Sequence, residues 1–209
     1  MTHTNHRQGT LESLSKDWVV FMYAARGVNH EGAGPKMQAF LHLALRHNPV
    51  NIGSPTIGNM YDTTTDKIME GLAGATKVYA VFDDGAKAAA LIMDAKEANL
   101  GVSVIVSGIF EEVEKICQTV GIKRHTAQCS LGVWGKTDHL PPPEILDITT
   151  MCGHGLVSFN LVRRMTDEVR KGNLNLEKAA VTLAKPCICG VFNPERAEEL
   201  LERCLSAGI

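Results

Sequence analysis

The chain has 209 residues, of which 44% are hydrophobic and 21% are charged, and its formal net charge is −2. This composition supports one packed domain, or one domain with a helical appendage, and it excludes a largely disordered chain. The charge is close to neutral and forms no basic patch, which argues against nucleic acid as a partner. No apolar run approaches the roughly 20 residues that a membrane helix needs, so we expect no membrane association.

The N-terminal residues contain no apolar signal segment, so we expect a soluble cytoplasmic protein. In a reducing compartment, cysteines stay free, bind metal or perform chemistry, and structural disulfides are rare. The six cysteines are Cys117, Cys129, Cys152, Cys187, Cys189 and Cys204.

Residues 1–15 are polar, and we expect a frayed or surface-bound tail. The apolar run at 18–25 predicts a buried strand, and Pro35 opens a predicted helix that continues to His47. Residues 49–62 are rich in Gly, Pro and Asn and are interpreted as a connection. A short helix is expected at 65–72.

The next segment alternates strands and helices with short turns between them. Strands are predicted at 77–82, 102–106 and 126–133, and helices at 86–98 and 110–120. A β-α-β-α-β order with apolar strands is typical of a parallel sheet with helices on both faces. We therefore predict an α/β domain over residues 16–140, with a parallel sheet of four to five strands.

Three prolines at 141–143 mark a boundary, and the rest of the chain has helical periodicity. Each of these helices has one apolar face, which needs a partner. Residues 141–209 are therefore expected to form a helical subdomain that carries Cys and His residues and packs on the sheet. The predicted helices cover 144–149, 156–171, 176–184 and 194–206.

Cys152 and His154 stand in the segment MCGHG, at 151–155, just before a predicted helix. Glycines on both sides of a histidine allow unusual backbone angles and close approach to a ligand. A thiol near a helix start lies in a positive field that favours thiolate, the form that attacks substrates or binds metals. The alternative is a loop cysteine that packs as a small apolar group.

The same segment resembles the first catalytic-cysteine segment of the proline racemase family, in which a helix-start thiol removes an α-proton. The resemblance covers five residues. The second cysteine segment of that family, Ser-Pro-Cys-Gly-Thr-Gly, has no match here, because Cys187 lies in KPCICG and shares only Pro-Cys. The predicted β-α-β-α-β order also differs from the racemase fold, so the activity is not carried over.

Cys187 and Cys189 lie between Pro186 and Gly190, which permit a tight turn that aims both sulfurs at one point. With Cys152 and His154 they supply three thiols and one imidazole. That set is complete for tetrahedral zinc, or for an iron–sulfur cluster held by three thiolates. Cys129, on the last predicted strand, is a further candidate ligand or else a core residue.

A Gly-rich loop follows the first strand and precedes a helix, and such loops bind anions at the carboxyl edge of parallel sheets. Arg26 suits a carboxylate or phosphate, and His30 and Glu31 suit proton transfer. The alternative is a polar surface loop. Substrate contacts are expected from Arg26, Asn29, Gly32 and Gly34. Asp83, Asp84 and Ser107 are interpreted as helix N-caps.

Three functional hypotheses remain open at this stage. The first is a protein that binds zinc or an iron–sulfur cluster, an enzyme of lyase or hydratase type acting on a small anionic molecule. The second is a metal-free cysteine-dependent enzyme with Cys152 as nucleophile or base and His154 or His30 as its proton partner. The third is a non-catalytic carrier or assembly module for metal, sulfur or a cluster. A homo-oligomer is compatible with each of them.

Overall fold

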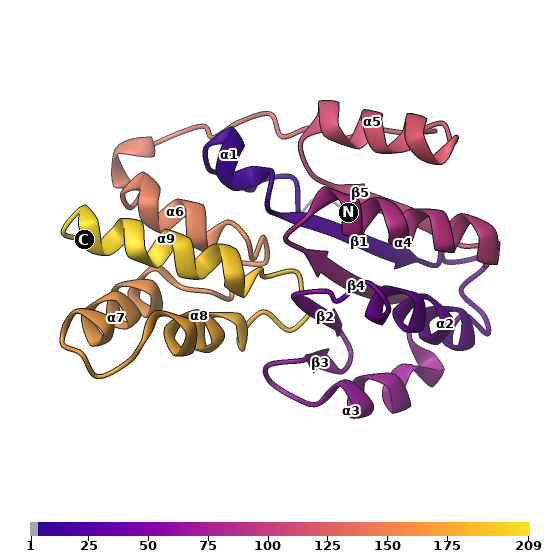
Figure 1. The fold of residues 1–209 in the computed structure, drawn as a ribbon, viewed down its shortest axis with the longest axis horizontal. Helices are drawn as coiled ribbons and strands as arrows, with labels where there is room; N and C mark the ends of the chain where they lie inside the picture. Colours follow the sequence, from indigo (N-terminus) through magenta and orange to yellow (C-terminus); the bar gives the residue numbers. More distant parts are fainter. Residues whose placement is uncertain (1–3) are drawn as a thin grey trace.

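A computed structural model describes residues 4–209 as one five-stranded sheet with helices against both faces (Figure 1). The strand order is β3-β2-β4-β1-β5, and every neighbouring pair is antiparallel. The strands are β1 (Trp18–Tyr23), β2 (Asn51–Ser54), β3 (Gly58–Asn59), β4 (Lys77–Phe82) and β5 (Ser103–Ser107).

The predicted parallel sheet is therefore wrong, and the reason lies in the segment interpreted as a connection. Residues 49–62 contain the hairpin β2–β3, which inserts an extra strand between β1 and β4 in the chain. Apart from the short β3, α3 and η1, the chain order becomes β1-α2-β2-β4-α4-β5. This is the split β-α-β arrangement, in which β4 lies between β2 and β1 and runs antiparallel to both.

The expected strand at 126–133 is also absent, and that segment has no regular secondary structure. Leu131 and Trp134 in this region are 85% and 83% exposed. Its composition suits a strand, but no sheet partner pairs with it, and isolated strands are not stable in water. The sheet therefore ends at β5.

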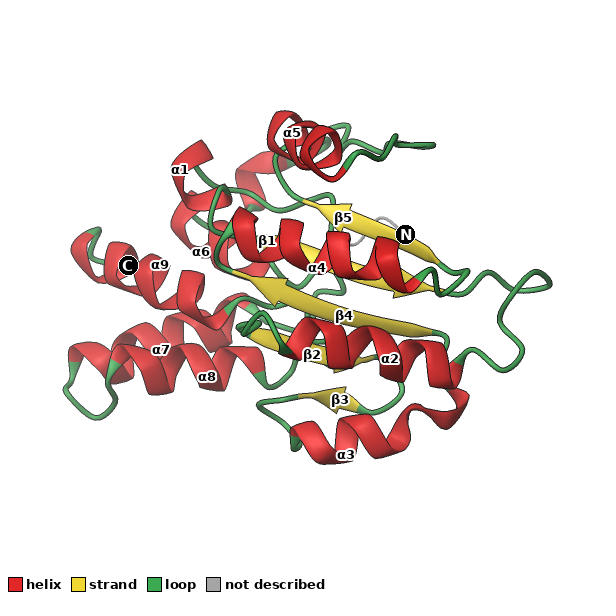
Figure 2. Cartoon of the chain, turned by 45° about the vertical axis from the view of Figure 1, so that its right-hand side comes forward, coloured by secondary structure: helices red, strands yellow, loops and turns green. Residues whose placement is uncertain are grey.

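One face of the sheet packs against α2 and α4, which lie in front of the strands in Figure 2. Val20 and Met22 of β1 point to this side, whereas Val19 and Phe21 point to the other. This alternation follows from the two-residue period of a strand. The helices on or near this face are α2 (Gly34–Leu45), α3 (Thr65–Glu70), the 3-10 helix η1 (Gly71–Gly74), α4 (Gly85–Ala98) and α5 (Phe110–Val120).

The C-terminal helices form the second layer, and the predicted C-terminal helical region is confirmed. Their apolar residues join Val19, Phe21, Tyr79 and Val81 of the sheet in a single buried cluster. The elements here are the 3-10 helix η2 (Thr137–His139), α6 (Pro143–Thr149), α7 (Phe159–Arg170), α8 (Leu176–Ala184) and α9 (Pro194–Ser206). None of the helices within residues 4–209 combines the length and apolarity of a membrane span.

The N-terminal segment packs between these layers. Thr4 and Ser13 are buried, and α1 (Leu11–Leu14) is capped by Thr10, whose side chain accepts the Ser13 amide. The amide of Gln8 donates to Thr150 Oγ1 at 3.0 Å, which fixes the segment to the end of α6. Residues 4–15 therefore belong to the packed structure, and residues 1–3 of the expected tail lie outside the described residues.

Candidate functional site

The second cysteine segment is a tight turn at the end of α8. The Cys187 amide donates to the carbonyl of Ala184 at 3.0 Å, and the Gly190 amide donates to the carbonyl of Cys187 at 2.9 Å. Gly190 has φ +78°, which is strained for any residue with a Cβ. The turn brings Cys187 Sγ within 3.9 Å of Cys189 Sγ.

Strand β2 holds this turn by close backbone contact. A Cβ at Gly53 would lie 2.8 Å from the carbonyl oxygen of Cys189, and a Cβ at Gly190 would lie 2.6 Å from the backbone of Ile52. Only glycine fits at either position. The missed strand β2 therefore carries a glycine because the thiol turn packs directly on it.

Asn59 of β3 fastens the turn from the other side. Its side-chain amide, which is fully buried, donates to the carbonyls of Ala184, Lys185 and Cys187 at 3.0–3.2 Å. Its Oδ1 accepts the backbone amide of Tyr61 at 2.8 Å. One side chain thus ties the end of α8 to the β2–β3 hairpin.

Cys152 lies in the turn that ends α6, and the expected position at a helix start is wrong. Its amide donates to the carbonyl of Thr149 at 3.1 Å, whereas α7 begins only at Phe159 behind its N-cap, Ser158. A helix field falls off within about one turn, so it does not reach this sulfur. Cys152 is buried, with Met151 beside it in the core.

The structure brings all three of these thiols and His154 into one row. Cys152 and Cys187 share a hydrogen bond, Cys187 is 3.9 Å from Cys189, and Cys189 Sγ is 3.7 Å from His154 Nδ1. The three cysteines are at most 1% exposed, whereas His154 is exposed. The row therefore runs from the core to the surface.

The three sulfurs differ sharply in acidity. The hydrogen bond to Cys187 and burial raise the pKa of Cys152 far above that of a free thiol. The hydrogen bond from Cys152 lowers the pKa of Cys187. The hydrogen bond to Cys189 and burial have the opposite and larger effect, and they raise the pKa of Cys187 to about 12. Donation from Cys187 lowers the pKa of Cys189 despite burial, helped by the Val191 amide and the charge of Arg7. Cys189 is therefore the most acidic thiol of the row.

Two buried arginines lie near Cys189. Arg7 and Arg196 both bind the carboxylate of Asp17, at 2.7 and 2.8 Å, and all three side chains are buried. Arg7 also donates to the carbonyl of Val191, which joins it to the thiol turn. Two guanidinium groups share one carboxylate here, so the cluster of Arg7, Arg196 and Asp17 has a net positive charge. A negative charge at Cys189 would bring the net charge of this buried cluster closer to zero.

The predicted anion loop, residues 24–33, lies away from the C-terminal helices, at the right-hand end of the sheet in Figure 1. Asn29 accepts the Ala25 amide at 2.7 Å and donates to the carbonyl of Gly101 at 2.8 Å. The Gly27 amide donates to His30 Nδ1 at 2.9 Å. The bonds to Ala25 and His30 close the loop on itself, and the bond to Gly101 ties it to the turn before β5. The antiparallel sheet has no shared carboxyl edge, which removes the reason for expecting this loop beside the thiols.

Gly34 opens α2, and a Cβ there would lie 2.1 Å from the carbonyl oxygen of Ala73, so close packing explains this glycine. The structure likewise separates the other members of the loop, Arg26, Glu31 and Gly32, from the thiol row. Asp84 caps α4, as predicted. Ser107 does not cap α5; its hydroxyl donates to the carbonyl of Thr4.

Cys129 is exposed on the irregular segment after α5, whereas the thiols of the row are buried. Cys117 and Cys204 are buried on α5 and α9, and Cys204 belongs to the cluster under the sheet. Burial raises the pKa of Cys204 to about 11. These three cysteines thus lie outside the row.

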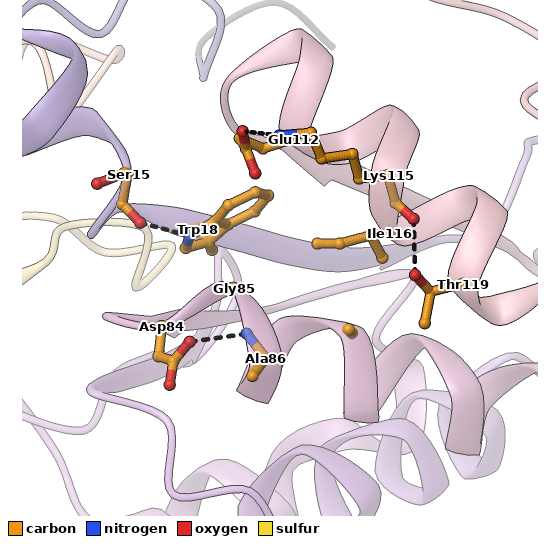
Figure 3. Close-up of a pocket in the computed structure, with 10 residues that line it drawn as sticks. Ser15, Trp18, Asp84, Gly85, Ala86, Glu112, Lys115, Ile116 and Thr119 are labelled. Atoms are coloured by element: carbon orange, nitrogen blue, oxygen red, sulfur yellow. Dashed lines mark hydrogen bonds and ion pairs between the residues drawn. The ribbon is translucent and has the colours of Figure 1, made fainter.

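A hollow of about 360 Å³ lies between the start of α4 and α5, with Trp18 at its floor (Figure 3). Trp18 donates to the carbonyl of Ser15 at 2.7 Å, Asp84 accepts the Ala86 amide, and Lys115 binds Glu112. Its polar groups are engaged in caps and local pairs. This hollow offers no reactive side chain.

No family model, curated protein or solved structure matches this chain. The resemblance of residues 151–155 to the proline racemases therefore has no wider support. A proposal of function therefore rests on the geometry of Cys152, Cys187, Cys189 and His154.

Among residues 4–209, no group of three or more His, Cys, Asp or Glu side chains is arranged to hold a metal ion. As placed, Cys152, Cys187, Cys189 and His154 form a row and do not surround one point. They do not fit an ion or a cluster without a movement of the side chains.

Sequence reasoning missed Arg7, Asp17, Asn59 and Arg196. The first two stand in a polar stretch that resembles a surface tail. Arg196 gives a weak signal, because it lies in the first turn of α9, where the helix dipole disfavours a cation. Asn59 follows Gly58 in a turn-like segment, where asparagine is common for local reasons.

Proposed function

We propose that this protein is a metal-free, thiol-dependent enzyme in which Cys189 is the nucleophile and His154 is its proton partner. The observation that carries this is the position of Cys189 Sγ, 3.9 Å from Cys187 Sγ and 3.7 Å from His154 Nδ1. A hydrogen-bond donor on one side and an imidazole at the surface are the parts that thiolate chemistry needs.

The arrangement suits exchange with a disulfide substrate. The Cys189 thiolate attacks one sulfur of the substrate, an S–S bond forms to Cys189, and the other half leaves as a thiolate that takes a proton from His154. Cys187 then gives its proton to the imidazole of His154, which the first step has left neutral, and attacks Cys189 Sγ. This second step releases the remaining half as a thiolate and leaves a disulfide between Cys187 and Cys189.

The surroundings supply the two conditions that this reaction needs. Arg7 and the Val191 amide favour the charged form of Cys189. Residues 153–156 are exposed, and His154 of this segment lies 3.7 Å from the buried Cys189 Sγ, so we expect a substrate to approach Cys189 from the side of His154. Because the resting protein requires free thiols, the proposal places it in a reducing compartment such as the cytoplasm.

The test uses a Cys129→Ser protein, since the exposed Cys129 reacts with any thiol reagent. Incubation with glutathione disulfide, followed by peptide mass spectrometry, is expected to give a disulfide between Cys187 and Cys189. The Cys187→Ser variant should retain glutathione on Cys189, and Cys204→Ser should behave as the parent. Glutathione on Cys152 alone, or no reaction in the folded protein, would overturn the proposal.

Zinc binding by Cys152, Cys187, Cys189 and His154 is the second candidate. It is favoured by the separations of 3.9 and 3.7 Å, because a tetrahedral zinc site places two sulfurs about 3.8 Å apart and a sulfur and a nitrogen about 3.6 Å apart. It requires the row to close around one point. Stoichiometric zinc in anaerobically purified protein, lost in Cys187→Ser but kept in Cys204→Ser, would support it over the first proposal.

The iron–sulfur and lyase hypotheses gain less from this geometry. Both combined the thiols with an anion held by Arg26, His30 and Glu31, and that loop lies elsewhere. A carrier of metal or sulfur is a variant of the zinc proposal. Ready release of the bound metal to a chelator would distinguish a carrier from a stable zinc site.

A further inference from the structure

A cavity of about 690 Å³ runs along the edge strand β5, between the N-terminal segment, the sheet and residues 122–130. This volume lies within the range of small-molecule sites, about 300–1,000 Å³. Phe21 and Tyr23 of β1 and Ile105 of β5 line it from the sheet side, and Arg7 lines it from the N-terminal segment. It is separate from the hollow of Figure 3, which lies between α4 and α5.

Arg7 is the feature that distinguishes this cavity. Its side chain is 6% exposed, its Nε binds Asp17 at 2.7 Å, and its Nη2 donates to the carbonyl of Val191. Its Nη1 is buried and makes no hydrogen bond among the described residues. A buried guanidinium nitrogen without an acceptor is costly, so a ligand oxygen would relieve it.

Neighbouring charges do not supply the missing acceptor. Asp17, the carboxylate that Arg7 binds among residues 4–209, is shared with Arg196. Of the other cations that line the cavity, Arg124 is paired with Glu114 at 2.8 Å and Lys123 is exposed to solvent. Arg7 is therefore the buried cation of this cavity that still has bonding capacity.

We propose that this cavity binds a small amphipathic carboxylate, with its acid group on Arg7 Nη1 and its apolar body against Phe21, Tyr23 and Ile105. The charge on Arg7 selects an anion, and the aromatic and aliphatic walls exclude a fully polar one. This site goes beyond the proposed thiol chemistry and does not depend on it, because binding requires no reaction at Cys189.

The test measures the binding of two probes of the same shape by calorimetry. 4-Phenylbutyrate carries the carboxylate, and 4-phenyl-1-butanol carries a hydroxyl in its place. We expect the parent protein to bind the carboxylate at least tenfold more tightly than the alcohol. The variant Arg7→Met should lose this preference, and Arg170→Met, a change of an exposed arginine on α7, should keep it.

Because Arg7→Met also disturbs Asp17, a second variant leaves the arginine in place. Ile105 is half-buried, and Ile105→Trp fills the cavity from β5, so it should abolish binding of both probes while the thermal melting curve stays cooperative. Equal affinity of the parent for both probes, no binding of either at millimolar concentration, or binding that survives Ile105→Trp would each overturn the proposal.

Discussion

Replacement of Asn59 by aspartate tests how the thiol turn is held, because the change is almost isosteric and replaces the hydrogen-bond donors with a carboxyl oxygen. The wild-type amide donates to three carbonyls, and two of these, in Ala184 and Cys187, also accept a backbone amide. A carboxylate at this buried position would face three carbonyl oxygens. Because the variant loses the hydrogen bonds of the amide and buries an unpaired charge, we expect its free energy of unfolding at pH 7 to fall by about 3 kcal/mol.

The loss should depend on pH in a defined direction. Burial and the carbonyl oxygens disfavour the ionised carboxyl, so its pKa is higher in the folded than in the unfolded protein. The folded variant then binds its proton more tightly than the unfolded one. The deficit relative to wild type should therefore grow as pH rises above about 4, by up to about 1.4 kcal/mol per pH unit, and level off above the folded pKa.

Urea unfolding of Asn59→Asp and wild type between pH 4 and pH 8 measures this difference. The control is Asn160→Asp, an exposed change near the start of α7, which should stay within about 0.5 kcal/mol of wild type. A small deficit that is independent of pH would show that Asn59 does not hold the end of α8 to the β2–β3 hairpin.

Three further substitutions test the packing around the site. Gly190→Ala should lower the free energy of unfolding by about 3 kcal/mol, because its Cβ would lie 2.6 Å from the backbone of β2. The control Gly172→Ala has a similar φ, +75°, but no atom within 4 Å of its Cβ, and it should lower the free energy of unfolding by about 1 kcal/mol. Urea unfolding compares the two variants, and equal losses would refute the close contact at Gly190. Arg196→Met should cost about 3–5 kcal/mol and expose residues 4–17 to protease, while Arg170→Met should do neither. Cys204→Ser should lower the melting temperature by several degrees and leave thiol exchange unchanged, and a loss of exchange would argue against its separation from the row.

Local signals in the sequence predicted several elements with their observed bounds. The ranges expected for α5, α8, α9 and β4 coincide with those in the structure. Helical periodicity, N-cap residues and a first-turn proline act within a few residues, so a single sequence carries them.

The sheet order was not predictable in this way, because it depends on pairing between distant segments. Strand β2 is four residues long and contains Asn51 and Gly53, both depleted in strands. Gly53 is needed for contact with the Cys189 turn, and Asn51 donates to the carbonyl of Phe192. Asn51 and Gly53 are therefore present for their contacts with the C-terminal layer, and their low strand propensity is why β2 was not predicted.

The thiols stood out in the sequence because two cysteines flanking one residue, beside proline and glycine, are rare. Which of the three thiols has the lowest pKa could not be inferred, because that depends first on the order of the hydrogen bonds in the row and then on the charge of Arg7. Local sequence favoured Cys152 through an expected helix start, and α7 begins several residues later. The lowered pKa of Cys189 comes mainly from the hydrogen bond of Cys187 and from the Val191 amide, both two residues away, and the charge of the distant Arg7 adds a smaller effect.

The most direct test of the account is the pH dependence of alkylation at each thiol. The Cys129→Ser protein would be treated with iodoacetamide from pH 5 to pH 10 under folding conditions, and each cysteine peptide quantified by mass spectrometry. We predict that Cys189 reacts at a lower pH than a free thiol and well before Cys187 and Cys152. Earlier reaction of Cys187 or Cys152, or simultaneous reaction of all three only on unfolding, would contradict a thiolate at Cys189.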